Sequence, residues 1–134
     1  MLGFRNRKLF YRKAIERALS WLVSHQHADG GFGAVETMSA TMVTPAALLY
    51  CGRPAEAARA ISWQRKAYVR EDGYFDPPEI RANRASSLAE QPYAPSWMIY
   101  SAHTNLAFDM SLRAVPHLLT MQDPVTGGMF GRAE

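Results

Sequence analysis

A helix end that runs into a glycine turn occurs three times in this chain of 134 residues. The three copies occupy residues 18–33, 57–75 and 115–131. Each copy has a phenylalanine two positions after a turn glycine, in the pairs Gly30 with Phe32, Gly73 with Phe75, and Gly128 with Phe130. The intervals between these glycines, 43 and 55 residues, leave room for two helices each. Because one amphipathic helix cannot bury its apolar face alone, the pattern predicts an array of stacked helical hairpins.

The turn residues have a physical role in this array. A residue just past a helix end often adopts a left-handed conformation, which only glycine takes without strain. We therefore expect left-handed conformations at Gly30 and Gly73, each of which follows an aspartate, Asp29 or Asp72. The phenylalanine two residues later can then fold back onto the helix that the chain has just left.

Four residues of the first copy have a spacing that resembles the Gln-Trp repeat of the squalene and hopene cyclases, with phenylalanine where that repeat usually has tryptophan. These residues are Trp21, Gln26, Gly30 and Phe32. The turns at residues 29–33 and 127–131 also resemble those of protein prenyltransferase β-subunits. The second copy departs from the pattern, with Val69 in place of glutamine, and the third has two extra residues between Gln122 and its turn.

This resemblance to the terpenoid cyclase/protein prenyltransferase superfamily implies an all-α fold, an α/α toroid of helical hairpins. In that family the repeats tie helices together at the outside of the barrel, so the turn residues are expected to be structural. A full toroid needs roughly twice as many hairpins as a chain of this size can hold. We expect residues 1–134 to form one helical-repeat domain, the N-terminal part of a longer toroid. A half-toroid that closes by dimerising and a short open solenoid are the alternatives.

Apolar periodicity predicts five helices. They span about residues 5–26, 46–51, 54–68, 97–108 and 111–121. The second and fourth are largely apolar, so we expect them to be inner helices that line the barrel. Thr44 and Ser96 are predicted N-caps, and Pro116 is expected near the first turn of the last helix or at a kink. Residues 76–95 interrupt the rhythm with four prolines, as a functional or mobile insertion does.

The net charge of +3 conceals a basic N-terminal segment, since residues 1–17 contain six Lys/Arg and one acid. Interleaved with apolar residues, this segment could lie on an anionic membrane surface, although a solvated helix start explains it more simply. No motif for nucleic acid accompanies the basic residues, so we expect no nucleic-acid partner. The single cysteine, Cys51, cannot form an internal disulfide, and no apolar run matches a signal peptide or a membrane span. These features predict a cytoplasmic protein, with membrane contact limited to its periphery.

Catalytic groups are not evident. The resemblance implies a strong acid in an Asp-x-Asp-Asp-Thr element at an inner helix of the cyclases, but no acid occupies the matching positions before Thr44 or Thr104. The zinc ligands of the prenyltransferases have no match either, and residues 25–29, with two histidines and Asp29, have poor metal-site spacing. We therefore expect no metal and no cofactor. His103 and Asp109 are weak catalytic candidates, for which hydrogen bonding in the core and helix capping are the simpler explanations.

Aromatic residues of the predicted inner helices can line an apolar cavity. Tyr50, Trp97, Tyr100 and His103 are the candidate substrate-binding residues, and their rings would suit an isoprenoid chain or stabilise a carbocation. Core packing explains the same residues equally well. Three classes of function stay open: a segment of an isoprenoid-handling cyclase or prenyltransferase, a non-catalytic helical-repeat module that binds a lipid or a protein, and a carbohydrate-active α/α toroid. An isolated segment should also expose an apolar face and self-associate.

Overall fold

The computed structural model describes residues 4–33, 41–75 and 92–129, with side chains from residue 7 onward. Helices are the regular elements of these ranges, and they are α1 (Phe4–Ser24), α3 (Thr44–Tyr50), α4 (Pro54–Tyr68), α6 (Tyr93–Thr104) and α7 (Phe108–Leu119). Strand structure in the described ranges is limited to two isolated bridges. The all-α fold class predicted from the sequence is confirmed.

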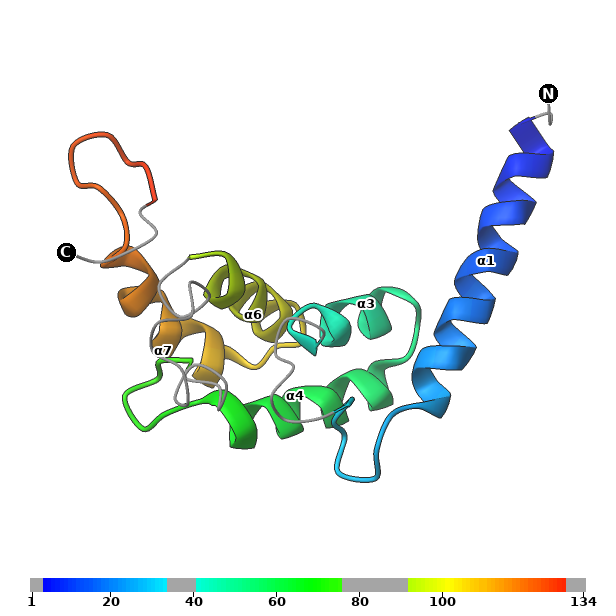
Figure 1. Cartoon of the computed structure of the whole chain (residues 1–134), viewed down its shortest axis with the longest axis horizontal. Helices are drawn as coiled ribbons and strands as arrows, with labels where there is room; N and C mark the ends of the chain where they lie inside the picture. Colours follow the sequence, from blue (N-terminus) through cyan, green and yellow to red (C-terminus); the bar gives the residue numbers. More distant parts are fainter. Residues whose placement is uncertain (1–3, 34–40, 76–91, 130–134) are drawn as a thin grey trace.

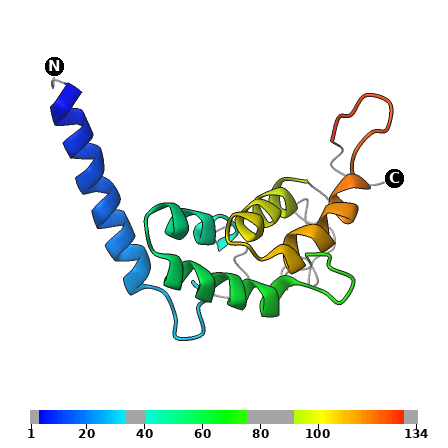
Figure 2. The same cartoon turned by 180° about the vertical axis from the view of Figure 1, so that it is seen from behind.

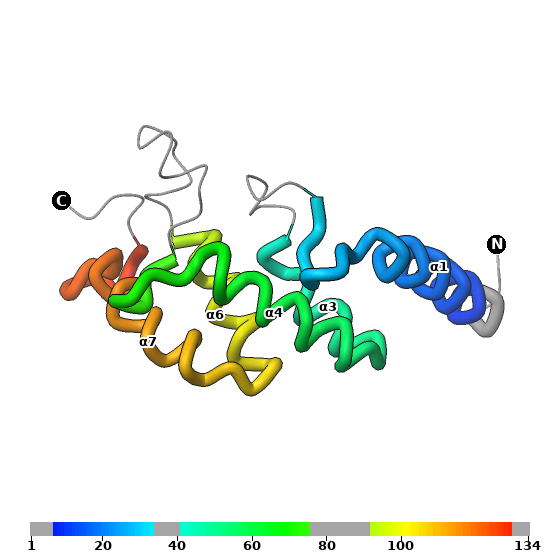
Figure 3. Tube along the Cα trace, turned by 90° about the horizontal axis from the view of Figure 1, so that it is seen from below, coloured from blue at the N-terminus to red at the C-terminus, as the bar shows by residue number. Residues whose placement is uncertain are grey.

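The helices form two hairpins that lie side by side. The helix α3 packs on α4, α6 packs on α7, and the two hairpins meet where α3 contacts α6. Figures 1 and 2 show α1 at one end of this bundle and the turn that follows α7 at the other. The view in Figure 3 shows the same separation of the two chain ends. The molecule is therefore elongated, with two different surfaces at its tips.

The two hairpins have the same connection between their helices. After α3, the amide of Gly52 donates to Leu49 O and that of Arg53 to Leu48 O, and Gly52 has a φ of 75°. After α6 the same pair of hydrogen bonds forms around Leu106, which has a φ of 60°. Both predicted bounds of the helix 97–108 are therefore wrong. It begins at Tyr93, and it ends before Leu106 because this leucine takes the left-handed conformation that the sequence rules assign to glycine.

The predicted caps are also wrong. Thr44 is the first residue of α3 rather than its N-cap, and no side chain caps that helix. Ser96 lies in the first turn of α6, where its hydroxyl donates to Pro92 O at 2.5 Å. Pro116 lies in the last turn of α7 instead of the first, since α7 starts at Phe108, three residues earlier than predicted. The helices α6 and α7 thus begin three residues upstream of Ser96 and Ser111, and α3 begins at Thr44 itself.

The core consists of two clusters. The larger contains apolar side chains of α4, α6 and α7 together with Phe75, and its most deeply buried members include Tyr68, Met98 and Met110. The smaller joins Leu48 of α3 to Ala57 and Ala60 of α4, and the C-terminal part of α1 packs on it. The apolar stripe predicted for α4 is thus buried as expected, while its basic residues face solvent.

Buried polar contacts attach residues 41–43 to both hairpins. Gln64 of α4 donates to Thr41 O at 2.6 Å, and Ser101 of α6 donates to Met42 O at 2.7 Å. Both side chains are almost fully buried, and a buried amide or hydroxyl without a partner costs about 1 to 3 kcal/mol. These bonds therefore fix the entry to α3 against α4 and α6.

Among residues 7–24, the apolar side chains of α1 are covered near the C-terminal end of the helix. Leu19 and Leu22 are half-buried against the smaller cluster, whereas Ile15 is 54% exposed. Leu9, Phe10 and Tyr11, which lie nearer the N-terminus, are also exposed. None of the helices in the described ranges is long and apolar enough to cross a membrane.

Candidate functional site

An aromatic row lies on the exposed faces of α3 and α6. Tyr93, Trp97 and Tyr100 follow one another at helical spacing on α6, with ring centroids 6.4 Å and 5.8 Å apart. The hydroxyl of Tyr100 lies 2.6 Å from that of Tyr50 on α3, although these residues are 50 positions apart. The structure therefore brings together three of the four predicted substrate-binding residues, Tyr50, Trp97 and Tyr100.

The row is solvent-exposed, with Tyr50 at 66% and Trp97 at 39%. Because contiguous exposed apolar groups are a feature of binding surfaces, this row of four is a candidate site. The hydrogen bond between the two hydroxyls, together with desolvation, raises the pKa of the Tyr50 phenol. Tyr93 was missed in the sequence because it lies upstream of the predicted helix start.

A groove of about 860 Å³ extends from Tyr50 along α1. Its apolar lining comes from Tyr11, Ile15 and Leu19, and cationic side chains line it as well. These cationic residues are Arg7, Lys8 and Arg12, and one acid, Glu16, lines the groove with them. The basic segment noted in the sequence thus forms one wall of a cavity rather than a uniformly solvated surface. Only the tertiary structure reveals this, because it places the end of α3 opposite α1.

The two weak catalytic candidates have structural partners. Asp109 forms a two-pronged salt bridge with Arg65, both N–O distances being 2.9 Å, and this hydrogen-bonded pair lowers the pKa of Asp109. A general acid needs the opposite shift. His103 lies on α6 with its Nδ1 3.3 Å from Ser111 Oγ and its ring against Phe108. Neither residue belongs to the aromatic row or lines the groove.

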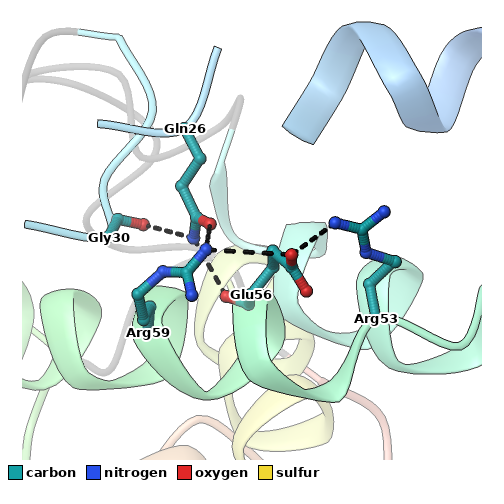
Figure 4. Close-up of polar contacts among 5 residues, drawn as sticks. All are labelled: Gln26, Gly30, Arg53, Glu56 and Arg59. Carbon is teal, nitrogen blue, oxygen red and sulfur yellow. Dashed lines mark hydrogen bonds and ion pairs between the residues drawn. The ribbon is translucent and has the colours of Figure 1, made fainter. Parts of the chain in front are cut away.

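The first glycine turn, residues 27–31, docks on α4. Gly30 has a φ of 98°, and a Cβ added to it would lie 2.3 Å from Arg59 O. Gln26 donates through its Nε2 to both Gly30 O and Glu56 O and accepts a hydrogen bond from Arg59 (Figure 4). Gln26 therefore links the end of α1 to the first turn and to α4.

The second turn, residues 70–74, repeats this arrangement on α7. Gly73 has a φ of 90°, and an added Cβ would lie 2.7 Å from the Cβ of Arg113. In both turns the aspartate before the glycine accepts a backbone hydrogen bond two residues ahead, from Gly31 to Asp29 and from Tyr74 to Asp72. The turns therefore share their internal geometry as well as their docking.

The third turn, residues 123–128, differs by one residue from the predicted alignment. Its left-handed glycine is Gly127, with a φ of 73°, and not Gly128. Gln122 donates to Gly127 O at 3.0 Å, as Gln26 does to Gly30 O. Thr126 takes the place of the aspartate, since its hydroxyl accepts from the amide of Gly128. The turn thus has one extra residue instead of two.

This shift changes which side chain follows the turn. Gln122 pairs with Met129 as Val69 pairs with Phe75, so Met129 occupies the position predicted for Phe130. Phe130 itself lies outside the described residues. Met129 was not predicted from the sequence because Phe130, one residue later, matches the phenylalanine of the other two turns.

Trp21 differs from the pattern in another way. It is exposed and stacks on His25, with ring centroids 4.1 Å apart. The buried tryptophan beside the first turn is Trp63 of α4, which fills the space where a Cβ on Gly31 would go. Phe32 is half-buried and packs against the smaller core cluster.

Comparison of the chain with protein-family models, with curated proteins and with solved structures gives no match. Within residues 4–33, 41–75 and 92–129, no group of three or more His, Cys, Asp or Glu side chains could hold a metal ion. Cys51 is free and exposed at the edge of the groove.

Acid should weaken the ion pairs at the start of α4. Glu56 lies between Arg53 and Arg59, and the hydrogen bond from Arg53 lowers its pKa to about 2. Since the folded pKa lies below the unfolded value of about 4.3, this stabilisation is complete above about pH 5 and is lost towards pH 2. We expect a Glu56→Gln variant to melt below the wild type at pH 6 and at nearly the same temperature at pH 2. Parallel thermal melts by circular dichroism measure the two differences, and a constant gap across this range would contradict the assignment.

Proposed function

We propose that this chain is a segment of an α/α toroid-type hairpin array that binds an isoprenoid chain with an anionic head group. The observation that carries the proposal is the groove between α1 and the end of α3, which combines an apolar floor with cationic side chains. Its volume of about 860 Å³ falls within the usual range for small-molecule sites. The proposed binding function is inferred from this groove and not from the fold.

The two parts of the surface suit the two parts of such a ligand. Tyr11, Ile15 and Leu19 offer contact to an alkyl chain, and Tyr50 continues this contact towards the aromatic row. Lys8 and Arg12 are exposed at the same groove and would attract a phosphate or carboxylate. The toroid-type array is supported by the repeated docking of a glycine turn on the next outer helix.

Catalysis is not part of the proposal. The aromatic row consists of three tyrosines and a tryptophan, and the acids Glu56, Asp72 and Asp109 each pair with an arginine. A carbohydrate-active toroid would need two carboxylates at the aromatic surface to flank a glycosidic bond. Binding without turnover is therefore favoured over both enzyme classes for the described surface.

Titration calorimetry with farnesyl diphosphate and farnesol tests the proposal. We expect the diphosphate to bind more tightly, with an affinity that falls as salt is added. Lys8→Gln should weaken diphosphate binding by about two- to fivefold, the effect of one exposed ion pair, and should leave farnesol unchanged. Lys66→Gln, which removes the same charge from the exposed side of α4, is the matched control.

A second pair of variants tests the apolar floor. Ile15→Asp should weaken both ligands by about tenfold or more, because it places a charge where the alkyl chain would lie. Leu112→Asp makes the same change at an exposed leucine on α7 and should have no effect. If neither ligand binds, or if Ile15→Asp binds as the wild type does, the isoprenoid proposal is wrong. Binding only to anionic vesicles, and not to the free ligands, would instead assign residues 1–17 to a membrane surface.

A further inference from the structure

Each of the three glycine turns has a glycine in the left-handed conformation, but the surroundings of the turns differ. Turn 1 (residues 27–31) lies against α4, and turn 2 (residues 70–74) lies against α7. Turn 3 (residues 123–128) closes with the equivalent hydrogen bonds, from Asp123 to Gly128 O and from Gly127 to Asp123 O. A Cβ added to Gly127 would meet only the amide of Gln122, at 3.8 Å. Turn 3 therefore resembles two turns that pack on a helix, but in the described part of the chain no helix packs on it.

The helix α1 is the outer helix that lies against no turn in the described residues. The spacing between helix and turn is constant, since Arg59 precedes Gly73 by 14 residues and Arg113 precedes Gly127 by 14. The same spacing counted back from Gly30 gives Glu16, at the centre of α1. Glu16 therefore occupies the helix position that receives a turn glycine on α4 and α7.

The surface of α1 at this position is open to solvent. Side chains of this one helix, Phe10, Lys13, Glu16, Arg17 and Ser20, line a shallow, open groove of about 610 Å³. Two of these residues are equivalent to α4 residues that meet turn 1, because Lys13 matches Glu56 and Ser20 matches Trp63 in the helix register. Ser20 is small where Trp63 is large, so the α1 groove has room for the bulkier turn 3.

We propose that turn 3 of one copy docks on α1 of a second copy around Glu16, as turns 1 and 2 dock on α4 and α7 within one copy. The exposed apolar side chains match, with Val125 at 90% exposure on the turn and Phe10 at 58% on the helix. The charges also match, because the turn carries Asp123 and the groove has Lys13 and Arg17 against the single acid Glu16. Gln122 can donate to a carbonyl of α1, as Gln26 donates to Glu56 O.

This contact joins two different surfaces, which lie at opposite ends of the molecule (Figures 1 and 3). Each copy can therefore accept one neighbour at α1 and offer turn 3 to another. Such a head-to-tail contact produces a closed ring or an open chain, depending on the rotation between copies. The small size of a turn and one helical face makes it a weak association.

Sedimentation velocity of the full chain, from about 5 µM to about 500 µM, tests the proposal in a range suited to weak interfaces. We expect the wild type to form dimers or larger species as the concentration rises. Gly127→Val blocks the turn and Ser20→Trp fills the groove, and each should raise the dissociation constant by at least about tenfold. Gly52→Val is the matched control, since Gly52 has a similar φ of 75° and open space around it but lines the other groove of α1.

Mixing the two blocked variants identifies the direction of the contact. Gly127→Val retains an intact α1 and Ser20→Trp retains an intact turn 3, so an equimolar mixture should form a heterodimer but nothing larger. Val125→Asp replaces Gly127→Val if the latter fails to fold, as judged by circular dichroism. A wild type that stays monomeric at every concentration overturns the proposal. Variants that associate as the wild type does, or a mixture that stays monomeric while the wild type associates, also overturn it.

Discussion

Replacing Phe75 by Ala is expected to lower the free energy of unfolding by about 3 to 5 kcal/mol, the usual cost of removing a buried phenylalanine. Phe75 is 2% exposed and belongs to the larger core cluster with Tyr68 and Met98. It reaches this position because the turn at Gly73 reverses the chain and pairs Phe75 with Val69. Loss of the ring leaves a cavity where α4, α6 and α7 meet.

Met129→Ala is the matched control for this variant. Met129 occupies the same position after turn 3, but it is 44% exposed and has no core to fill among the described residues. We expect a cost of about 1 kcal/mol or less for this exposed position. Urea denaturation gives both values, provided that the slope m is unchanged between variants. Equal losses for Phe75→Ala and Met129→Ala would mean that the third turn is covered in solution or that Phe75 is not in the core.

Gly30→Val is expected to cost about 2 to 5 kcal/mol. A left-handed conformation costs a residue with a side chain about 1 to 2 kcal/mol, and overpacking adds about 1 to 3 kcal/mol. The second effect applies because the new Cβ would lie 2.3 Å from the carbonyl oxygen of Arg59, so the turn must move away from α4. The Gln26 hydrogen bond to Glu56 O would weaken as the turn moves.

Gly52→Val separates the two contributions. Gly52 has a φ of 75° and no heavy atom within 4 Å of an added Cβ, so this variant should show only the backbone strain of about 1 to 2 kcal/mol. Thermal unfolding followed at the same pH compares the two variants directly. If Gly30→Val is no more destabilising than Gly52→Val, the contact of the first turn with α4 contributes nothing to stability.

Helices and glycine turns follow from local sequence, and this explains what could be predicted. The stripe of α4 repeats with the helical period, and Arg53-Pro54 marks its start, so its bounds and its buried face were both clear. Gly30 and Gly73 follow helix ends, where the backbone itself demands a left-handed residue. The aromatic residues of the candidate site, Tyr50, Trp97 and Tyr100, were found because they interrupt otherwise small, apolar helices.

Particular hydrogen bonds and the packing of helices decided two features that the sequence patterns missed. Leu106 takes a left-handed conformation because the amides of Leu106 and Ala107 cap the end of α6, and packing against α7 offsets a strain that no local rule anticipates. The third turn closes at Gly127 because Gln122 and Thr126 hydrogen-bond to its backbone, a choice between two adjacent glycines that spacing alone resolves wrongly.

The candidate binding site depends most on tertiary structure. Residues 1–17 determine a basic, partly apolar helix by themselves, and solvent exposure is the simplest expectation for such a helix. Only the fold places Tyr50 across from Ile15 and Leu19 and turns the helix surface into a groove. Helix formation depends on neighbours within a few residues, which the sequence states directly. A groove depends on the relative positions of two helices that are far apart in the sequence. Here the packing of the smaller core cluster determines those positions.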